Sequence, residues 1–405
     1  MSGKEIRNLT TPIEPVPGNN IELTIDTRLQ NAAQQALIGE IDYWNQYFNE
    51  IRSSNGVVIA MNPKTGEILA MVTYPTYENN RMARFIPAYY YRQLVADPWK
   101  PLFNHAISAE HPPGSVFKMP TAVGALNEGV VTPEQKLNDP GQITVMERNL
   151  LNEPVRPFTY VCWKPDGHGE MDWIHGVANS CDVYFYKIGG GYAPDGVTGV
   201  GPWRLGGYAR ALGYGARTGI ELPGEASGLI PDPDWKRINA GESWLPGDTY
   251  IASMGQGYIL ATPLQVLVSA AILANDGKYM QPTLIRDILD PEGNVVKPFE
   301  PTLKWDVTKD PVIQVYDENN LLTGEHKTIQ PWVVQMSKDA MRLVVTEGTA
   351  KGVWATSKIQ NTAGKTGTAE YCDNIARAKN LCNRGSWPTH SWYFGYAPYD
   401  DPEIA

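Results

Sequence analysis

A serine and a lysine lie three residues apart in residues 111–120, HPPGSVFKMP, and have the types and spacing of a nucleophile with its base. The prolines and Gly114 interrupt any preceding element, and the apolar spacing that follows predicts that Ser115 opens a helix. Residues i and i+3 share a helix face, so the Ser115 hydroxyl and the Lys118 amine would lie close together. Alone, this short and common pattern is better explained by a capping serine followed by a surface lysine.

Two further motifs follow in a fixed order and favour catalysis. Ser180 and Asp182 form an S-x-[N/D] motif, and residues 365–367 read K-T-G inside a strand-like segment. The ordered set S-x-x-K, S-x-[N/D] and K-T-G is the signature of penicillin-interacting serine enzymes. Each motif is weak by itself, but the three in order indicate one acyl-transfer site.

The segments that must position these motifs predict an α/β (α+β) domain. Residues 56–61 and 67–73 form an antiparallel hairpin, and Asp26 or Thr27 caps a helix that runs through Ile41. Strand-like segments return at residues 282–290, 362–371 and 390–398, whereas residues of about 100–280 are helix-rich. We therefore expect residues 1–19 to be a connector and residues 20–405 to form one domain, with a central antiparallel sheet flanked by helices and an inserted helical lobe.

Composition limits the function classes. The chain has 405 residues, 42% of them apolar, which is enough for a packed interior. Its net charge is −10 and it has no basic stripe, so we expect no nucleic-acid partner. The longest apolar stretch, residues 264–274, is well short of the ~20 residues that cross a bilayer, and predicts a buried helix.

A group of metal-binding residue types surrounds the second motif. Its members are Cys162, His168 and Cys181, with Asp139 upstream and His175 as a reserve. Thiolate, imidazole and carboxylate together suit tetrahedral zinc. If residues 180–182 are extended, Cys181 points away from Ser180, and a metal would support the motif from behind without touching substrate. The spacing is not a standard finger pattern, so buried free cysteines remain the alternative.

Two other cysteines, Cys372 and Cys382, bracket a polar loop after the K-T-G strand. Outside the cytoplasm they would form a disulfide that closes this loop, and two unpaired thiols are the alternative.

Longer segments resemble successive landmarks of the class B penicillin-binding proteins. They cover nearly the whole chain after the connector: GVVIAMNPKTGEILAMVTYPTYENN, HPPGSVFKM, ALGYGARTGIELPGEASGLIP, MGQGYILATPLQ, GKTGTAE and WYFGYAPYDDPEIA. CWKPDGHG followed by SCDVYFY is most similar to the elongation-type penicillin-binding protein 2 group. The resemblance implies a penicillin-binding transpeptidase (serine β-lactamase-like) fold and a D,D-transpeptidase that cross-links peptidoglycan stem peptides during cell elongation and is acylated by β-lactams.

Each catalytic role has a physical reason. Ser115 is the nucleophile, favoured by the partial positive charge at a helix start. Lys118 is the base, which requires a pKa depressed by burial and by a neighbouring cation, Lys365. Ser180 passes a proton between Lys118 and the leaving amine.

The K-T-G strand would bind the substrate. Thr366, Gly367 and Thr368, with Lys365, are expected to hold the carboxylate of the peptide or drug, since alternate strand residues share one face. The resemblance implies that the backbone N–H groups of Ser115 and Thr368 form the oxyanion hole.

Asp182 replaces the asparagine common in this motif. A carboxylate near Lys118 favours the charged amine, so Asp182 either hydrogen-bonds elsewhere or forms a resting ion pair that substrate binding reorganises. We assign it to substrate orientation, with helix capping as the alternative.

The resemblance also implies a structural zinc site held by Asp139, Cys162, His168 and Cys181, with Cys162 where relatives have a carboxylate. It implies a catalytic domain at the outer face of the cytoplasmic membrane, held by an N-terminal anchor and pedestal absent from this chain. It further implies pairing with a SEDS-family glycan polymerase. Relatives would add a last strand and helix after Ala405, so we expect an incomplete sheet.

Two other function classes fit the motifs. A D,D-carboxypeptidase or a β-lactamase would use water as the acceptor, but no carboxylate in the sequence is recognisable as a deacylating base. A non-catalytic β-lactam sensor would keep the acylated serine without turnover.

Overall fold

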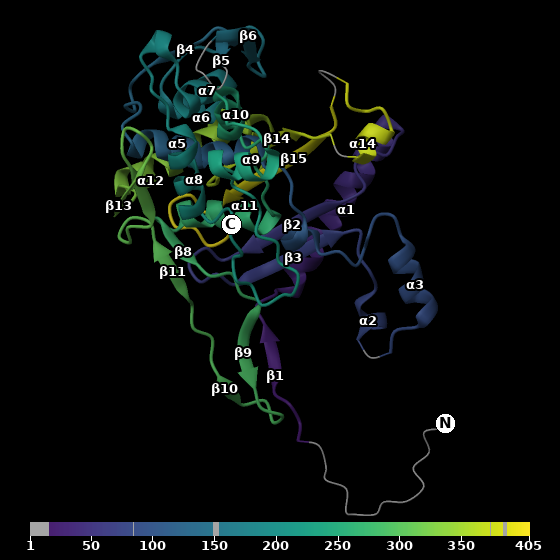
Figure 1. The fold of residues 1–405 in the computed structure, drawn as a ribbon. Coiled ribbons are helices and arrows are strands. Elements are labelled where there is room, and N and C mark those ends of the chain that lie inside the picture. The colour runs from purple at the N-terminus through teal and green to yellow at the C-terminus, as the bar shows by residue number, and fades with distance from the viewer. Residues whose placement is uncertain (1–15, 84, 149–153, 373, 384–386) are drawn as a thin grey trace, which may run out of the picture.

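The computed structural model describes residues 16–83, 85–148, 154–372, 374–383 and 387–405, and Figure 1 shows their arrangement. Two antiparallel hairpins form the sheet framework. Strand β2 (Gly56–Met61) pairs with β3 (Ile68–Tyr74), and β14 (Ala363–Glu370) pairs with β15 (Thr389–Tyr396). Ala405 exchanges two backbone hydrogen bonds with Met61, and Ile404 bridges to Ala397. The expected sheet is therefore present as two hairpins, which the final described residues connect.

Helices cover these hairpins as predicted. Helix α1 (Thr27–Phe48) packs on β2 and β3, and its N-cap Asp26 accepts hydrogen bonds from the N–H groups of Arg28 and Leu29. Helix α11 (Pro263–Ala274) is buried from Leu264 to Ala274 and contacts β2, β8 and β15. Helix α12 (Pro331–Thr346) lies against β14 and α6.

The segment between the hairpins is rich in short helices. These are α2 (Asn79–Met82), α3 (Ala88–Ala96), α4 (His105–Ser108), α5 (Lys118–Asn127), α6 (Trp173–Ala178), α7 (Asp182–Gly190), α8 (Gly201–Ala211), α9 (Pro233–Ala240) and α10 (Pro246–Ser253), with 3₁₀ turns η1 (Gly114–Phe117) and η2 (Ala193–Asp195). The lobe also contains two strand pairs that the sequence pattern did not predict. Strand β4 (Leu137–Asp139) pairs with β7 (Gly169–Met171), and β5 (Gln142–Arg148) pairs with β6 (Pro154–Val161).

The remaining strands form three small sheets. They are β1 (Asn20–Leu23) with β9 (Ile285–Leu289) and β10 (Val295–Lys297); β8 (Lys278–Met280) with β11 (Leu303–Asp306); and β12 (Ile313–Tyr316) with β13 (Leu322–Lys327). Helices α13 (Lys351–Trp354) and α14 (Asn374–Ala378) complete the described elements. In Figure 1 the β1–β9–β10 sheet extends from the end of the molecule opposite β5 and β6. Of the predicted connector, residues 1–15 lie outside the described residues.

One large hydrophobic cluster runs through the sheet framework and the lobe. Its largest buried side chains include Phe117, Trp173, Tyr184 and Tyr208. The first and second motifs are attached to this core through Phe117 and Tyr184. In the described part of the chain, no helix combines the length and apolar character needed to cross a membrane.

Candidate active site

The first motif lies at the junction of a 3₁₀ turn and a helix. Ser115 belongs to η1, and α5 begins at Lys118, so the predicted helix starts one turn later than expected. Gly114 has φ +57°, and a Cβ atom there would lie 2.4 Å from the Thr368 carbonyl oxygen. Glycine thus lets the Ser115 turn press directly against β14. Ser115 is partly exposed, whereas Lys118 is fully buried.

A local reversal of the backbone sets the second motif. Ser180 has φ +51°, a left-handed conformation that is rare for serine, in the link between α6 and α7. The next residue, Cys181, is extended, and its sulfur caps α7 by accepting the Tyr184 N–H. Ser180 and Cys181 consequently point to different partners, although residues 180–182 are not uniformly extended as the sequence argument assumed.

Ser180 connects the two lysines of the motifs. The Ser180 hydroxyl lies 2.8 Å from the Lys365 amine and 3.3 Å from the Lys118 amine. Lys118 also donates to the Ser180 carbonyl at 2.8 Å, and Lys365 to the Thr366 carbonyl at 3.0 Å. Three segments far apart in the sequence therefore meet in one buried polar network.

Asp182 forms the ion pair that was one of its two expected arrangements. One carboxylate oxygen lies 2.6 Å from the Lys118 amine, and the other accepts the Trp163 N–H at 2.8 Å. The Lys118 amine is thus held by a carboxylate, so the base role predicted for Lys118 requires this contact to rearrange during the reaction. Capping is not its role here, since Cys181 is the N-cap of α7 and Asp182 is the first helical residue.

Lys365 differs electrostatically from Lys118. Burial lowers the pKa of Lys365 well below its ordinary value, and the nearby charge of Lys118 lowers it further, while Asp182 acts in the opposite direction.

The third motif presents its side chains as predicted. Along β14, Thr366 is partly exposed and Thr368 is exposed, whereas Lys365 and Gly367 are buried. The two threonine hydroxyls therefore share an accessible face. A Cβ atom on Gly367 would lie 2.9 Å from the Val116 backbone nitrogen, so glycine keeps the strand close to the Ser115 turn.

Thr349 is a site residue that sequence reasoning missed. Its hydroxyl lies 2.6 Å from the Thr366 hydroxyl, and its N–H donates to the Ala178 carbonyl. A Cβ atom on the preceding Gly348 would lie 2.2 Å from that carbonyl. The residues after α12 thus join the second motif to the third. No motif in the sequence marks them.

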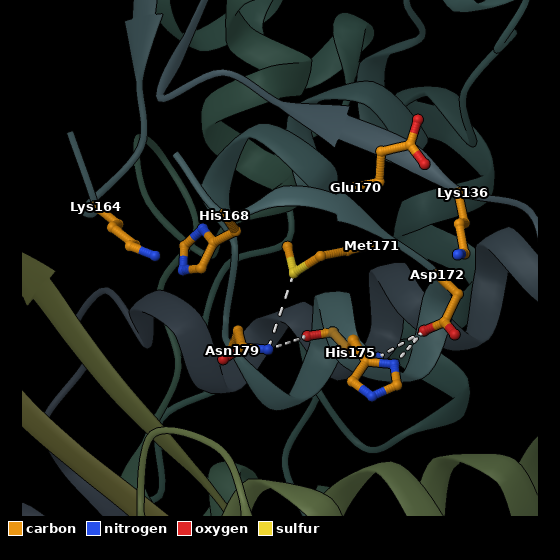
Figure 2. Close-up of a pocket in the computed structure, with 8 residues that line it drawn as sticks. All are labelled: Lys136, Lys164, His168, Glu170, Met171, Asp172, His175 and Asn179. Carbon is orange, nitrogen blue, oxygen red and sulfur yellow. Dashed lines mark hydrogen bonds and ion pairs between the residues drawn. The ribbon is translucent and has the colours of Figure 1, made fainter. Parts of the chain in front are cut away.

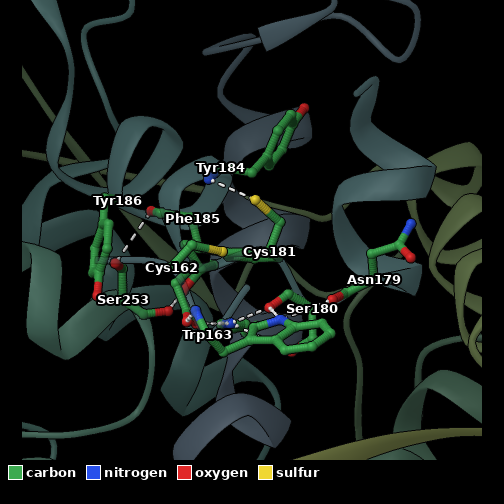
Figure 3. Close-up of polar contacts among 12 residues, drawn as sticks. Cys162, Trp163, Asn179, Ser180, Cys181, Tyr184, Phe185, Tyr186 and Ser253 are labelled. Atoms are coloured by element: carbon green, nitrogen blue, oxygen red, sulfur yellow. Dashed lines mark hydrogen bonds and ion pairs between the residues drawn. The ribbon is translucent and has the colours of Figure 1, made fainter. Parts of the chain in front are cut away.

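Trp163, which no sequence motif marked as a site residue, lies at the site surface and is 57% exposed. Its indole N–H lies 3.1 Å from the Ser180 carbonyl and 3.2 Å from the Asn179 carbonyl, and Figure 3 shows the ring beside Ser180. The indole N–H of Trp163 therefore binds the backbone of the second motif, and its backbone N–H binds the Asp182 carboxylate. Its position directly after Cys162 was the available signal.

The four predicted metal ligands converge behind the second motif. Ligand atoms of Asp139, Cys162, His168 and Cys181 all lie within 4.8 Å of one another. The Asp139 carboxylate lies 2.7 Å from His168 Nδ1 and 3.1 Å from the Cys181 sulfur, and Cys162 Sγ lies 3.5 Å from His168 Nδ1. Figure 3 shows Cys181 directed away from Ser180, on the same side as Cys162.

The thiols of this cluster differ in acidity. A hydrogen bond from Cys181 lowers the pKa of Cys162 to about 6, although its burial opposes ionisation. Burial raises the pKa of Cys181.

The reserve ligand His175 lies outside the cluster. Its Nδ1 is 2.6 Å from the Asp172 carboxylate, and it lines a separate hollow of about 350 Å³ that also reaches His168 (Figure 2). His175 is therefore not needed to complete the four-residue set.

Cys372 and Cys382 form a disulfide. The bond closes the loop after β14, which is the first of the two alternatives expected for this pair.

Comparison with known proteins places this geometry in a family. Residues 56–405 match the family described as the penicillin binding protein transpeptidase domain. The chain belongs to this family. The chain is 32% identical over 396 residues to the peptidoglycan D,D-transpeptidase MrdA of Acinetobacter baumannii, covering 97% of this chain and 51% of that protein.

Solved structures show the same fold. PBP2 of Pseudomonas aeruginosa, in complex with WCK 5153, aligns with a TM-score of 0.73 and 31% identity, over 96% of this chain and 73% of that one. A peptidoglycan synthase complex, described as coordinating polymerization and crosslinking, contains a chain that aligns with a TM-score of 0.72 and 28% identity over 96% and 59%. The predicted penicillin-binding transpeptidase fold is confirmed. The chain spans about half the length of the curated relatives it matches.

Proposed function

We propose that this transpeptidase domain is the catalytic part of a peptidoglycan D,D-transpeptidase that cross-links stem peptides through an acyl-enzyme on Ser115 during cell elongation, and that β-lactams acylate the same serine. The network that joins Lys118, Ser180 and Lys365 beside the Ser115 turn carries the proposal. Relatives that are named peptidoglycan D,D-transpeptidases support it.

The residues divide the reaction between them. Ser115 Oγ attacks the carbonyl of the terminal peptide bond, and its proton leaves through the amines and the Ser180 hydroxyl. The N–H groups of Ser115 and Thr368 stabilise the oxyanion, at roughly 3–4 kcal/mol per donor in comparable enzymes. Thr366 and Thr368 hold the substrate carboxylate, Gly367 lets their strand approach Ser115, and Asp182 orients the substrate side of the second motif through Lys118. The terminal peptide bond then breaks, and D-alanine leaves with a proton supplied through Ser180. An amine of a second stem peptide takes the acyl group from Ser115, whose oxygen regains a proton.

A hydrolase is the principal alternative, because the acyl-enzyme is shared. Both oxygens of Asp182 are occupied, by Lys118 and by the Trp163 N–H, so this carboxylate is not available to activate water. This favours an amine acceptor. The test is a thioester analogue of acyl-D-Ala-D-Ala offered with a D-amino acid. We expect the aminolysis product, with no such product from S115A. Hydrolysis of the thioester without aminolysis would favour a carboxypeptidase or β-lactamase. A stable drug adduct with no turnover of the thioester would favour a sensor.

We further propose that Asp139, Cys162, His168 and Cys181 hold a structural zinc ion. Tetrahedral zinc with bonds of about 2.0–2.3 Å separates its ligand atoms by ~3.3–3.8 Å, and the four donors need move little from their present distances to reach that arrangement. Bound zinc would fix Cys181, and through it the adjacent Ser180, without contributing to acyl transfer.

Location and partners extend the same proposal. We place the domain at the outer face of the cytoplasmic membrane, where the Cys372–Cys382 disulfide would persist. The intact mass of unreduced protein tests the disulfide: it should rise by about 2 Da on reduction, since each broken bond gains two hydrogens. A SEDS-family glycan polymerase is the proposed partner of the whole protein. The similarity to a chain of a peptidoglycan synthase complex supports this pairing.

A further inference from the structure

We propose that Lys365 rests as a neutral amine, with Lys118 as the charged partner of Asp182, and that Lys365 holds the Ser115 proton between attack on the carbonyl and departure of the leaving amine. The inference builds on the proposed acyl-transfer function and assigns the resting charge of each lysine. It rests on the partners of the two amines.

The buried lysines in the described part of the chain differ in their partners. They are Lys118, Lys187, Lys236, Lys338 and Lys365. Four have a carboxylate partner: Lys118 pairs with Asp182, Lys187 with Asp195, Lys236 with Asp248, and Lys338 with Asp276. Among the described residues Lys365 has no carboxylate oxygen within 4.0 Å, although it is fully buried. An unpaired charge in such a place is strongly disfavoured.

Counting hydrogen bonds gives a second argument. An ammonium group has three N–H donors, and Lys118 has three acceptors: the Asp182 carboxylate, the Ser180 carbonyl and the Ser180 hydroxyl. A neutral amine has two N–H donors and one lone pair. Lys365 has two partners, the Ser180 hydroxyl and the Thr366 carbonyl. A charged Lys365 would therefore leave one buried N–H donor unpaired, whereas a charged Lys118 leaves none.

The charged groups around Lys365 agree with this assignment. Lys118 on α5 and Asp182 on α7 act on it in opposite directions. On α12, which packs against β14, Arg342 binds the Gln360 and Thr362 carbonyls, and Asp339 binds the Tyr399 hydroxyl. On β15 the residue opposite Lys365 is Phe394. With Lys365 neutral, the charges of Lys118 and Asp182 balance.

Substrate binding changes that balance. A carboxylate held by Thr366 and Thr368 brings a negative charge to the accessible face of β14, next to Lys365, and favours a proton on its amine. The Ser115 O–H bond breaks, its oxygen bonds to the carbonyl carbon, and the carbonyl electron pair moves onto oxygen. Lys118 gives one proton to Ser180 and takes that of Ser115, while Ser180 gives its own to Lys365. Up to this point the net transfer is one proton from Ser115 to Lys365. When the oxyanion collapses, the C–N bond breaks and the leaving nitrogen takes that proton back through Ser180.

The test reads each lysine directly, by NMR of protein labelled with ¹³C and ¹⁵N in lysine. K365R and, independently, K365M assign the Lys365 signal, and K187R assigns a buried lysine that has a carboxylate partner. At pH 7 the Cε and Nζ shifts of Lys365 should be those of a neutral amine and those of Lys187 those of an ammonium. In the penicillin G adduct the ring nitrogen has taken the Ser115 proton, but the carboxylate of the drug remains in the site. This charge favours uptake of a proton from solvent by Lys365, whose shifts should move to the charged values.

Charged shifts for Lys365 in the free protein would overturn the assignment. Neutral shifts that persist in the penicillin adduct would overturn its coupling to the carboxylate. Labelling of Ser115 is measured in the same sample. If penicillin acylates Ser115 but the free protein has a charged Lys365, only this inference is refuted. If penicillin does not acylate Ser115, the proposed function is refuted, and the NMR shifts still report the resting charge of Lys365.

Discussion

Replacing Lys365 with methionine should stabilise the protein, and the gain should depend on pH. The side chain is fully buried without a carboxylate partner among the described residues, and its pKa is well below the ordinary 10.5. In the unfolded chain the same lysine carries a proton. Folding at neutral pH therefore removes a proton from wild type but not from K365M, and this opposes folding of wild type.

The magnitude follows from proton linkage. Where the unfolded state binds one more proton, the free energy of unfolding rises by about 1.36 kcal/mol per pH unit. The window extends from the lowered pKa of the folded state up to 10.5. Between pH 7 and pH 9 wild type should thus gain up to about 2.7 kcal/mol relative to K365M, which is the full slope over two pH units. The advantage of K365M is largest at the lower pH and shrinks as pH rises.

The assay is urea unfolding of both proteins at pH 7, 8 and 9. K187M is the matched control, because Lys187 is also buried but has the Asp195 carboxylate as its partner. The stability difference between wild type and K187M should be nearly constant. A constant difference between wild type and K365M would refute the reasoning, since it would mean that Lys365 keeps its proton on folding.

Three further substitutions test other parts of the site. G114A places a Cβ 2.4 Å from the Thr368 carbonyl oxygen, and should lower the free energy of unfolding by about 1–3 kcal/mol and slow penicillin acylation. Its control is G129A, which has a similar φ and open space around the new Cβ and should leave acylation unchanged. W163F removes the indole donor to the Ser180 carbonyl, and should slow acylation while lowering the free energy of unfolding by about 1 kcal/mol or less. W99F, the control, should change neither quantity. Equal acylation rates in W163F and wild type would show that the indole does not hold Ser180. C181S should lower zinc per chain in elemental analysis while C162D, which supplies another ligand oxygen, retains it; unchanged zinc in C181S would remove Cys181 from the proposed site.

Much of the framework could be predicted from local patterns. Asp26 caps α1, the hairpin of β2 and β3 has its predicted pairing, and α11 is buried along its length, because caps, alternation and apolar runs act over a few residues. The face shared by Thr366 and Thr368 follows from strand geometry in the same way. The ordered motifs identified the residues that would meet, but not how they meet.

The parts that sequence reasoning missed depend on tertiary contacts. The left-handed Ser180 is held by α6, α7 and the Trp163 indole, which come together only in the fold. Thr349 enters the site because the residues after α12 reach the Ala178 carbonyl. Both lysines could be identified from sequence, but their charges could not, since these depend on which amine lies next to the Asp182 carboxylate.

The proposed function requires that the three motifs form one site in which the Ser115 hydroxyl accepts the acyl group. Mass spectrometry of penicillin-treated protein, digested and mapped, tests it most directly. We expect one adduct, on the peptide that contains Ser115. This adduct should be absent in S115A and should still form in K187M. An adduct on Ser180, or none on a folded wild-type protein, would contradict it.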